Sequence, residues 1–236
     1  MVLTASQSAP PHDDDTPQGQ EPVHSGSEAP QLLPNLIPLE PQDVQFERAF
    51  GGRVSLRFTT MSWNAGAGPF EIVPGQTDAD SQLVYQRIYR ADGSYDDRPA
   101  GRFVFHPQHQ HMHFDNYATY ALYSVDAGDT YRTESKTSFC LRDSRLYEPE
   151  LAGAPRLPAY QECENAKQGL SVGWSDRYGY DLPGQALDVT DLPPGYYELT
   201  IVVDPENQIV ESDEGDNIAG WGLYLDVEED RIDILY

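Results

Sequence analysis

The chain has 236 residues, and its 39 Asp and Glu against 15 Lys and Arg give a formal net charge of −24 at pH 7. This length fits one large domain or a domain with a tail. The 19 Gly and 19 Pro argue against an all-α bundle and favour turn-rich β structure. A field this negative repels phosphate backbones and anionic lipid surfaces, so nucleic-acid binding is set aside.

The composition also predicts the environment of the protein. Arg greatly outnumbers Lys, since Lys136 and Lys167 are the only lysines. High acidity with few lysines is typical of a halophilic protein, which must stay hydrated in concentrated salt. No run of 18 apolar residues and no intact signal peptide is visible. We therefore expect no transmembrane segment and an extracellular or cell-surface location, reached through a signal that this sequence does not show.

The chain begins with a polar segment and continues as short apolar runs. Residues 1–31 are rich in Pro, Ser, Gln, Asp and Glu, which predicts a disordered leader before a domain over residues 32–236. Residues 146–184 lack a clear period and are expected to form an excursion or lid-like region. Apolar runs bounded by turn residues predict strands at 32–39, 54–63, 83–90, 102–108, 117–125, 186–192, 196–204, 208–213 and 217–227.

These runs predict a mainly β fold, a β-sandwich-like domain with long loops and few short helices. Alternation is clearest where Tyr197, Leu199, Ile201 and Val203 share one face of a strand. Elsewhere, the even pair Cys140 and Cys163 could form one disulfide, with two buried thiols as the alternative.

Four of the six histidines fall within eight residues. On a strand, His109, His111 and His113 share one face and His106 lies on the other. Three imidazoles can meet one ion if the strand bends, although stacked histidines also occur on solvated strand faces. Imidazole ligation suits zinc or copper, and the triplet does not settle which metal binds. Three ligands leave a coordination position open for a reaction.

Three motifs resemble the catalytic domain of lysyl oxidases. They are FHPQHQHMH at 105–113, KTSFCL at 136–141 and SDRYGYD at 175–181. Further similar segments follow in family order from about residue 32 to residue 228. Animal members have more cysteines than the two present here, so the resemblance is to a microbial member of the family.

The resemblance implies a copper- and quinone-dependent oxidase. Its copper ligands are His109, His111 and His113, and its lysine tyrosylquinone cofactor forms from Lys136 and Tyr178. The family's proposed general base corresponds to Asp176. The implied reaction is oxidative deamination of primary amines, free or in peptidyl-lysine, by O₂ to aldehyde, ammonia and hydrogen peroxide. A disulfide between Cys140 and Cys163 would tether the lysine segment to the excursion that leads to the tyrosine.

A second ion site is predicted at ESDEGDN, residues 211–217, where oxygen ligands are crowded beside a strand end. Hard oxygen ligands at this spacing suit Ca²⁺, and a solvated acidic turn is the alternative. The resemblance adds an element near the start of the domain. The implied calcium ligands are Asn35, the Leu36 carbonyl, Glu211, Asp213, Asp216 and Asn217.

A rival interpretation is a non-catalytic secreted β-sandwich module that binds calcium and captures copper or zinc. Only the joint presence of Lys136, Tyr178 and the histidine triplet separates the two functions. Under the oxidase interpretation, the acidic surface should attract cationic amines and Lys-rich peptides.

Overall fold

The computed structural model describes residues 22–77, 81–107, 111–127, 129–163 and 167–235, and all the regular elements among them are strands. The predicted mainly β fold is confirmed, while none of the few short helices that we expected occurs in these described ranges. It follows that this part of the chain has no helix long and apolar enough to cross a membrane.

The strands are β1 (Gln31–Leu32), β2 (Leu36–Pro38), β3 (Gln42–Arg48), β4 (Val54–Asn64), β5 (Phe70–Thr77), β6 (Ser81–Arg90), β7 (Tyr95–His106), β8 (His111–Ser124), β9 (Asp129–Phe139), β10 (Arg145–Leu146), β11 (Gln168–Leu170), β12 (Trp174–Tyr178), β13 (Ala186–Asp188), β14 (Gly195–Val203), β15 (Ile218–Asp226) and β16 (Arg231–Leu235).

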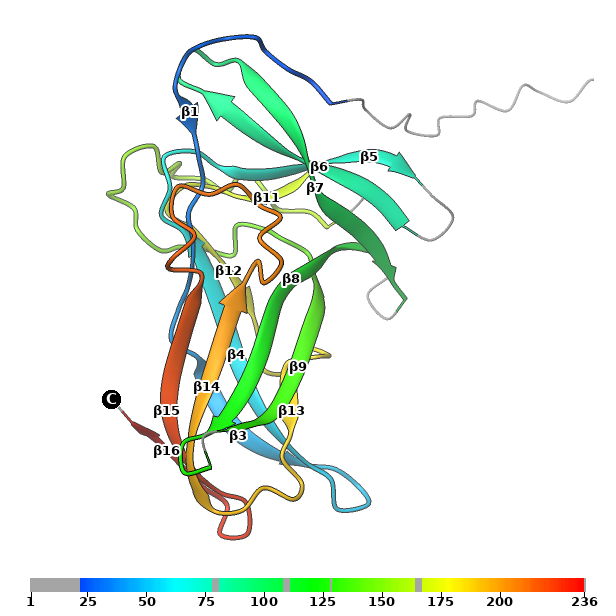
Figure 1. Ribbon diagram of the computed structural model, residues 1–236, viewed down its shortest axis with the longest axis vertical. Coiled ribbons are helices and arrows are strands. Elements are labelled where there is room, and N and C mark those ends of the chain that lie inside the picture. The colour runs from blue at the N-terminus through cyan, green and yellow to red at the C-terminus, as the bar shows by residue number, and fades with distance from the viewer. Residues whose placement is uncertain (1–21, 78–80, 108–110, 128, 164–166, 236) are drawn as a thin grey trace, which may run out of the picture.

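The strands form two antiparallel sheets. The larger sheet has the order β11-β5-β6-β7-β8-β14-β15-β16, with β1 on β6 and β9 on β8. The smaller sheet has the order β10-β12-β4-β13, and β2 and β3 also pair with β4. Figure 1 shows the two groups of the larger sheet, with β5, β6 and β7 at one end and β8, β14 and β15 along the body of the molecule.

The core lies between β8 of the larger sheet and β4 of the smaller one. The hydroxyl groups of Tyr120 and Thr60 are 3.0 Å apart, and those of Tyr117 and Ser62 are 2.6 Å apart. The ring of Phe58 meets Tyr120 edge to face at 5.1 Å between centroids. Since buried hydroxyl groups are costly without partners, these pairs also fix how the sheets face each other.

The alternation predicted for β14 is confirmed. Tyr197, Leu199, Ile201 and Val203 are each 2% exposed or less, whereas Glu198 on the opposite face is exposed. Burying such side chains is worth ~1.5–3 kcal/mol each. β14 pairs with β8 and β15, so both of its edges are covered.

One expectation about the chain path is wrong. Residues 208–213 form no strand, and the Asp204 carboxylate accepts the amides of Gln208 and Ile209, at 3.0 and 2.8 Å, in place of a strand partner. The region 146–184 lies mostly outside strands, as expected of an excursion, but it also contributes β11 to the larger sheet and β12 to the smaller.

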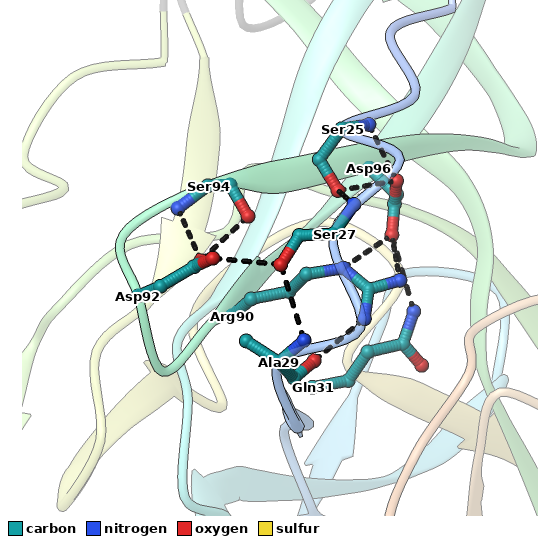
Figure 2. A network of polar contacts seen from close by, with 8 residues as sticks. All are labelled: Ser25, Ser27, Ala29, Gln31, Arg90, Asp92, Ser94 and Asp96. Carbon is teal, nitrogen blue, oxygen red and sulfur yellow. Dashed lines mark hydrogen bonds and ion pairs between the residues drawn. The ribbon is translucent and has the colours of Figure 1, made fainter.

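Residues 22–30 run beside the β6–β7 hairpin and lead into β1. The Asp96 carboxylate accepts the Ser25 amide at 2.9 Å and binds the guanidinium of Arg90. Arg90 in turn donates to the Ala29 carbonyl at 2.6 Å. Figure 2 shows this network, which ties the segment to the hairpin through one ion pair.

The predicted leader overlaps this segment. Residues 1–21 lie outside the described ranges, and residues 22–31 make the contacts above and enter strand β1. The domain boundary after residue 31 stays a prediction.

The turn between β4 and β5 holds the start of β2 in place. Buried Asn64 accepts the amides of Asn35 and Gly66 on one side-chain oxygen, at 3.0 and 2.9 Å. A Cβ atom at Gly66 or Gly68 would collide with the backbone of residues 32–34. Glycine therefore allows this close backbone approach, which places Asn35 beside the β4–β5 turn.

Candidate active site

Two of the predicted copper ligands face each other at the start of β8. His111 and His113 lie on one face, as the alternation predicts, with ring centroids 4.8 Å apart and Nε2 atoms 2.9 Å apart. His113 is only 1% exposed. In the β7–β8 register the backbone of His106 is opposite His111. His109, the third predicted ligand, lies outside the described residues.

A pocket of about 310 Å³ opens beside this histidine pair. Its lining combines the imidazoles with the disulfide, the predicted cofactor tyrosine and residues that the motifs do not single out. The described lining residues are His111, His113, Cys140, Arg142, Cys163, Arg177, Tyr178 and Leu182.

Tyr178, at the end of β12, is buried and held by the backbone of Cys140. Its hydroxyl accepts the Cys140 amide and donates to the Cys140 carbonyl at 2.9 Å. The Phe139 ring packs against it at 4.1 Å between centroids. Burial, and then the charge of Asp176, raises the pKa of the Tyr178 phenol well above its ordinary value, while Arg142 acts in the opposite direction. The phenol is therefore fixed and protonated.

The Cys140–Cys163 disulfide is present and closes one side of the pocket. A ring nitrogen of His111 lies within 4.8 Å of both sulfur atoms. These sulfur atoms are joined to each other, so they offer no thiolate to a metal. Lys136 lies on β9 with its backbone opposite Ala118, and its side chain is outside the described part of the structure.

Asp176 lies on the interior side of Tyr178. It is 3% exposed, and one carboxylate oxygen accepts the Ser144 hydroxyl at 3.0 Å. The two residues face a small internal cavity of about 10 Å³, close to the volume that one water needs. Tyr117 and Tyr120 also line this cavity. Asp176 is thus next to the tyrosine but absent from the described lining of the larger pocket.

The sequence analysis did not select the two arginines of the pocket. Arg177 alternates with Asp176 and Tyr178 along β12, which turns its side chain outward, and it pairs with Asp43 at 3.1 Å. Arg142 is exposed between the buried residues Leu141 and Asp143. The only available signal was proximity in sequence to Cys140 and Tyr178, and proximity alone does not predict a shared pocket.

The two segments that carry the predicted calcium ligands meet at the other site. The acidic turn, residues 211–217, packs against the start of β2. Asn35 donates to the Asp216 carboxylate at 2.9 Å and accepts the Asp213 amide at 3.1 Å. The structure thus joins segments about 180 residues apart, at the positions where the resemblance places one ion.

Burial dominates the electrostatics of the acidic turn. Glu211 is 6% exposed, accepts the Leu36 amide, and accepts the Asn217 side-chain amide at 2.8 Å. Burial raises the pKa of Glu211 to about 8. One side-chain oxygen each of Asp216 and Asn217 is buried without a hydrogen-bond partner in the described part of the chain. Buried oxygens of this kind fit a hard cation.

Two further acids near this turn were not predicted as ligands. Carboxylate oxygens of Asp204, Glu211 and Glu214 lie within 4.8 Å of one another. Burial also raises the pKa of Asp204. The proximity of these carboxylates and the burial of Asp204 both result from the path of residues 204–214. The sequence analysis predicted part of this segment as a strand, so it did not bring the three acids together.

The comparisons with known proteins point to one family. The lysyl oxidase family model matches residues 77–233. Lysyl oxidase homolog 1 of Homo sapiens is 34% identical over 158 residues, which are 64% of this chain and 26% of the relative. Lysyl oxidase homolog 3A of Danio rerio is 35% identical over 130 residues, which are 53% of this chain and 16% of the relative. The chain thus spans about a quarter or less of the length of these relatives. Because the family model covers more than half of its residues, the chain belongs to the lysyl oxidase family.

Proposed function

We propose that this protein is a copper- and quinone-dependent oxidase of primary amines, including lysine side chains of peptides or proteins. The observation that carries the proposal is the convergence of two imidazoles and a buried tyrosine on one pocket. The overall reaction consumes one amine, one O₂ and one water and yields one aldehyde, one ammonia and one hydrogen peroxide. Family membership supports the general class of amine oxidation.

The histidine pair fits a metal ion. Nitrogen atoms 2.9 Å apart can both lie ~2.0–2.1 Å from a single point, which is the usual metal–imidazole distance. We propose that His111 and His113 bind copper together with His109. Copper bound there supplies one-electron chemistry with O₂. Zinc has similar ligand preferences, so the metal identity belongs to the test below.

Lys136 and Tyr178 are proposed to form the lysine tyrosylquinone. The chain holds the tyrosine hydroxyl on the Cys140 backbone, so the ring has one fixed position in the pocket wall. Phe139, which contacts that ring, is three residues from Lys136 on strand β9. The amine of Lys136 must lose its proton to form a bond to the ring, and burial promotes this loss.

Asp176 is proposed as the base that removes a proton from the amine substrate. It lines the small cavity beside Tyr178 and not the described wall of the larger pocket, so it would reach a substrate through one water or after a local rearrangement. The Ser144 hydroxyl orients the carboxylate.

The acidic turn is proposed as a structural calcium site. Asn35, the Leu36 carbonyl, Glu211, Asp213, Asp216 and Asn217 would hold the ion, which would tie the start of β2 to the loop before β15. The partnerless oxygens of Asp216 and Asn217 support this assignment.

An extracellular or cell-surface location is proposed as well, because the single disulfide suits an oxidising compartment. A microbial and salt-adapted source stays a prediction from composition.

The test is an intact mass and visible spectrum of the copper-loaded protein, followed by peptide mapping. We expect a quinone absorption band, a cross-linked peptide containing Lys136 and Tyr178, and amine-dependent hydrogen peroxide. Tyr178→Phe should lose all three. Tyr197→Phe is the matched control, since it removes another buried hydroxyl, which donates to the Pro193 carbonyl and lines neither the pocket nor the small cavity beside Asp176. Bound copper without band or cross-link in the wild-type protein would favour the non-catalytic metal-binding module.

A further inference from the structure

The wall of the active-site pocket has the opposite charge to the chain as a whole. The net charge is −24, yet the described lining contains two arginines and no carboxylate. With only 15 basic residues in 236, two in one small lining are a local excess. A substrate in contact with this wall meets a different potential from a substrate approaching the surface.

The two arginines are not equally available. Arg177 forms an ion pair with Asp43 at 3.1 Å, and both side chains are nearly half exposed. Asp43 therefore offsets much of its charge. Among the described residues Arg142 has no ion-pair or hydrogen-bond partner for its guanidinium, and its side chain is exposed. Among the described side chains of the lining, Arg142 is consequently the main permanent cation that a ligand can bind.

The backbone that carries Arg142 is fixed on both sides. The preceding residue, Leu141, is fully buried and its amide donates to Gln168 at 3.1 Å. The following residue, Asp143, accepts the amides of Ser171 and Ala159 at 2.8 and 2.7 Å. A cation on such a rigid support costs little ordering when it binds a ligand.

We propose that Arg142 makes the pocket select primary amines that carry a carboxylate at their other end, such as ω-amino acids. The proposal rests on the oxidase function, because the selected group is the part of the substrate that does not react. Guanidinium groups bind carboxylates through two parallel charge-assisted hydrogen bonds. The proposal reverses the expectation from net charge, under which purely cationic amines are the best substrates.

The test uses a matched pair of substrates, 6-aminohexanoate and pentylamine, which differ only by the carboxylate. For the copper-loaded wild-type protein we expect kcat/KM for 6-aminohexanoate to exceed that for pentylamine about tenfold, the effect of one charge-assisted hydrogen bond. Arg142→Gln should bring this ratio near one, and Arg142→Glu should invert it. High salt should reduce the wild-type ratio by screening.

Arg53→Gln is the matched control. It removes the same charge from an exposed residue that pairs with Asp188. Arg53 is far from the pocket, because it lies seven positions before Thr60, which is the residue of β4 that pairs with Tyr178. That spacing is ~23 Å along the strand. The substrate ratio should stay at its wild-type value in this variant.

A binding measurement separates this proposal from the oxidase function. Calorimetric titration of the copper-free protein with hexanoate should show binding that weakens about tenfold in Arg142→Gln. If both amines are oxidised equally well and Arg142→Gln changes neither ratio nor hexanoate binding, the carboxylate proposal is overturned while the oxidase function stands. If neither amine is oxidised, the oxidase function fails, and the hexanoate titration alone decides whether the pocket binds carboxylates.

Discussion

The pocket beside Tyr178 and the acidic turn are both predicted metal sites, but their polar groups are arranged differently. In the acidic turn most groups are bound to one another or to the backbone, as Glu211 is to Leu36 and Asn217. In the pocket the imidazoles and arginines face an open volume of about 310 Å³. Both regions join distant segments of the chain. The different arrangement of their polar groups therefore does not come from a difference in sequence separation.

This difference matches the two proposed roles, a stabilising ion site in the acidic turn and a reacting site in the pocket. A set of oxygens that are largely paired within the fold gives its binding energy to the folded state, because an ion bound there would hold two segments together. An open site with a rigid wall gives its binding energy to a ligand that enters and leaves. Changes in the pocket should therefore affect chemistry more than stability, and changes in the acidic turn should do the opposite.

The largest expected effect tests the chemistry of the pocket. Lys136→Arg should reduce amine-dependent hydrogen peroxide below detection, because an arginine cannot supply a neutral amine to the tyrosine ring. Copper content and melting temperature should stay near wild type. Lys167→Arg is the ideal control, since it changes the only other lysine, whose amine binds Glu71 at 3.1 Å. Full activity in Lys136→Arg would remove the proposed cofactor.

The next effect concerns the metal. His111→Ala and His113→Ala should each lower bound copper from one equivalent to far below it, as measured by elemental analysis after dialysis against a weak chelator. Loss of one imidazole from a three-ligand site removes much of its affinity. His24→Ala is a matched control from outside the pocket lining. One full equivalent of copper in both pocket variants would contradict the ligand assignment.

The comparison also shows what sequence could predict. Strand alternation placed His111 and His113 on one face, and the β14 residues in the core, because side-chain direction repeats every two residues. Arg142 and Arg177 could not be recognised as neighbours, because only the meeting of the Cys140 segment with β12 places them in one wall. The strand expected at 208–213 failed for a similar reason, since its amides donate to groups from elsewhere in the chain, beginning with Gln208 and Ile209 to Asp204.

A moderate effect tests the acidic turn. Added calcium should raise the melting temperature of the wild-type protein by several degrees at fixed ionic strength, because the ion binds only the folded state. The double change Glu211→Gln, Asp213→Asn should abolish this rise and leave the copper content intact. Asp226→Asn with Asp233→Asn, on β15 and β16, makes the same number of carboxyl-to-amide changes elsewhere. An equal calcium response in both double variants would mean that calcium acts on general surface charge.

The smallest expected effect lies in the network of Figure 2, away from both metal sites. Asp96→Asn should lower the free energy of unfolding by ~1 kcal/mol, since it weakens the hydrogen bonds to Ser25 and the ion pair with Arg90. The measurement is urea unfolding at pH 7, combined with hydrogen exchange at the Asp97 amide, which donates to the Val23 carbonyl at 2.6 Å. That amide should exchange faster in the variant.

Acid should reproduce this effect in the wild-type protein. The Ser25 amide, followed by Arg90, lowers the pKa of Asp96 to about 2, below its value in the unfolded chain. A depressed carboxyl pKa stabilises the fold above the unfolded value of ~3.9, and this stability is lost as the pH falls toward 2. The stability difference between wild type and Asp96→Asn should therefore be constant from pH 5 to 7 and shrink as the pH falls from about 4 toward 2. A difference that persists unchanged at pH 2 would mean that the ionised carboxylate does not hold residues 22–30 on the hairpin.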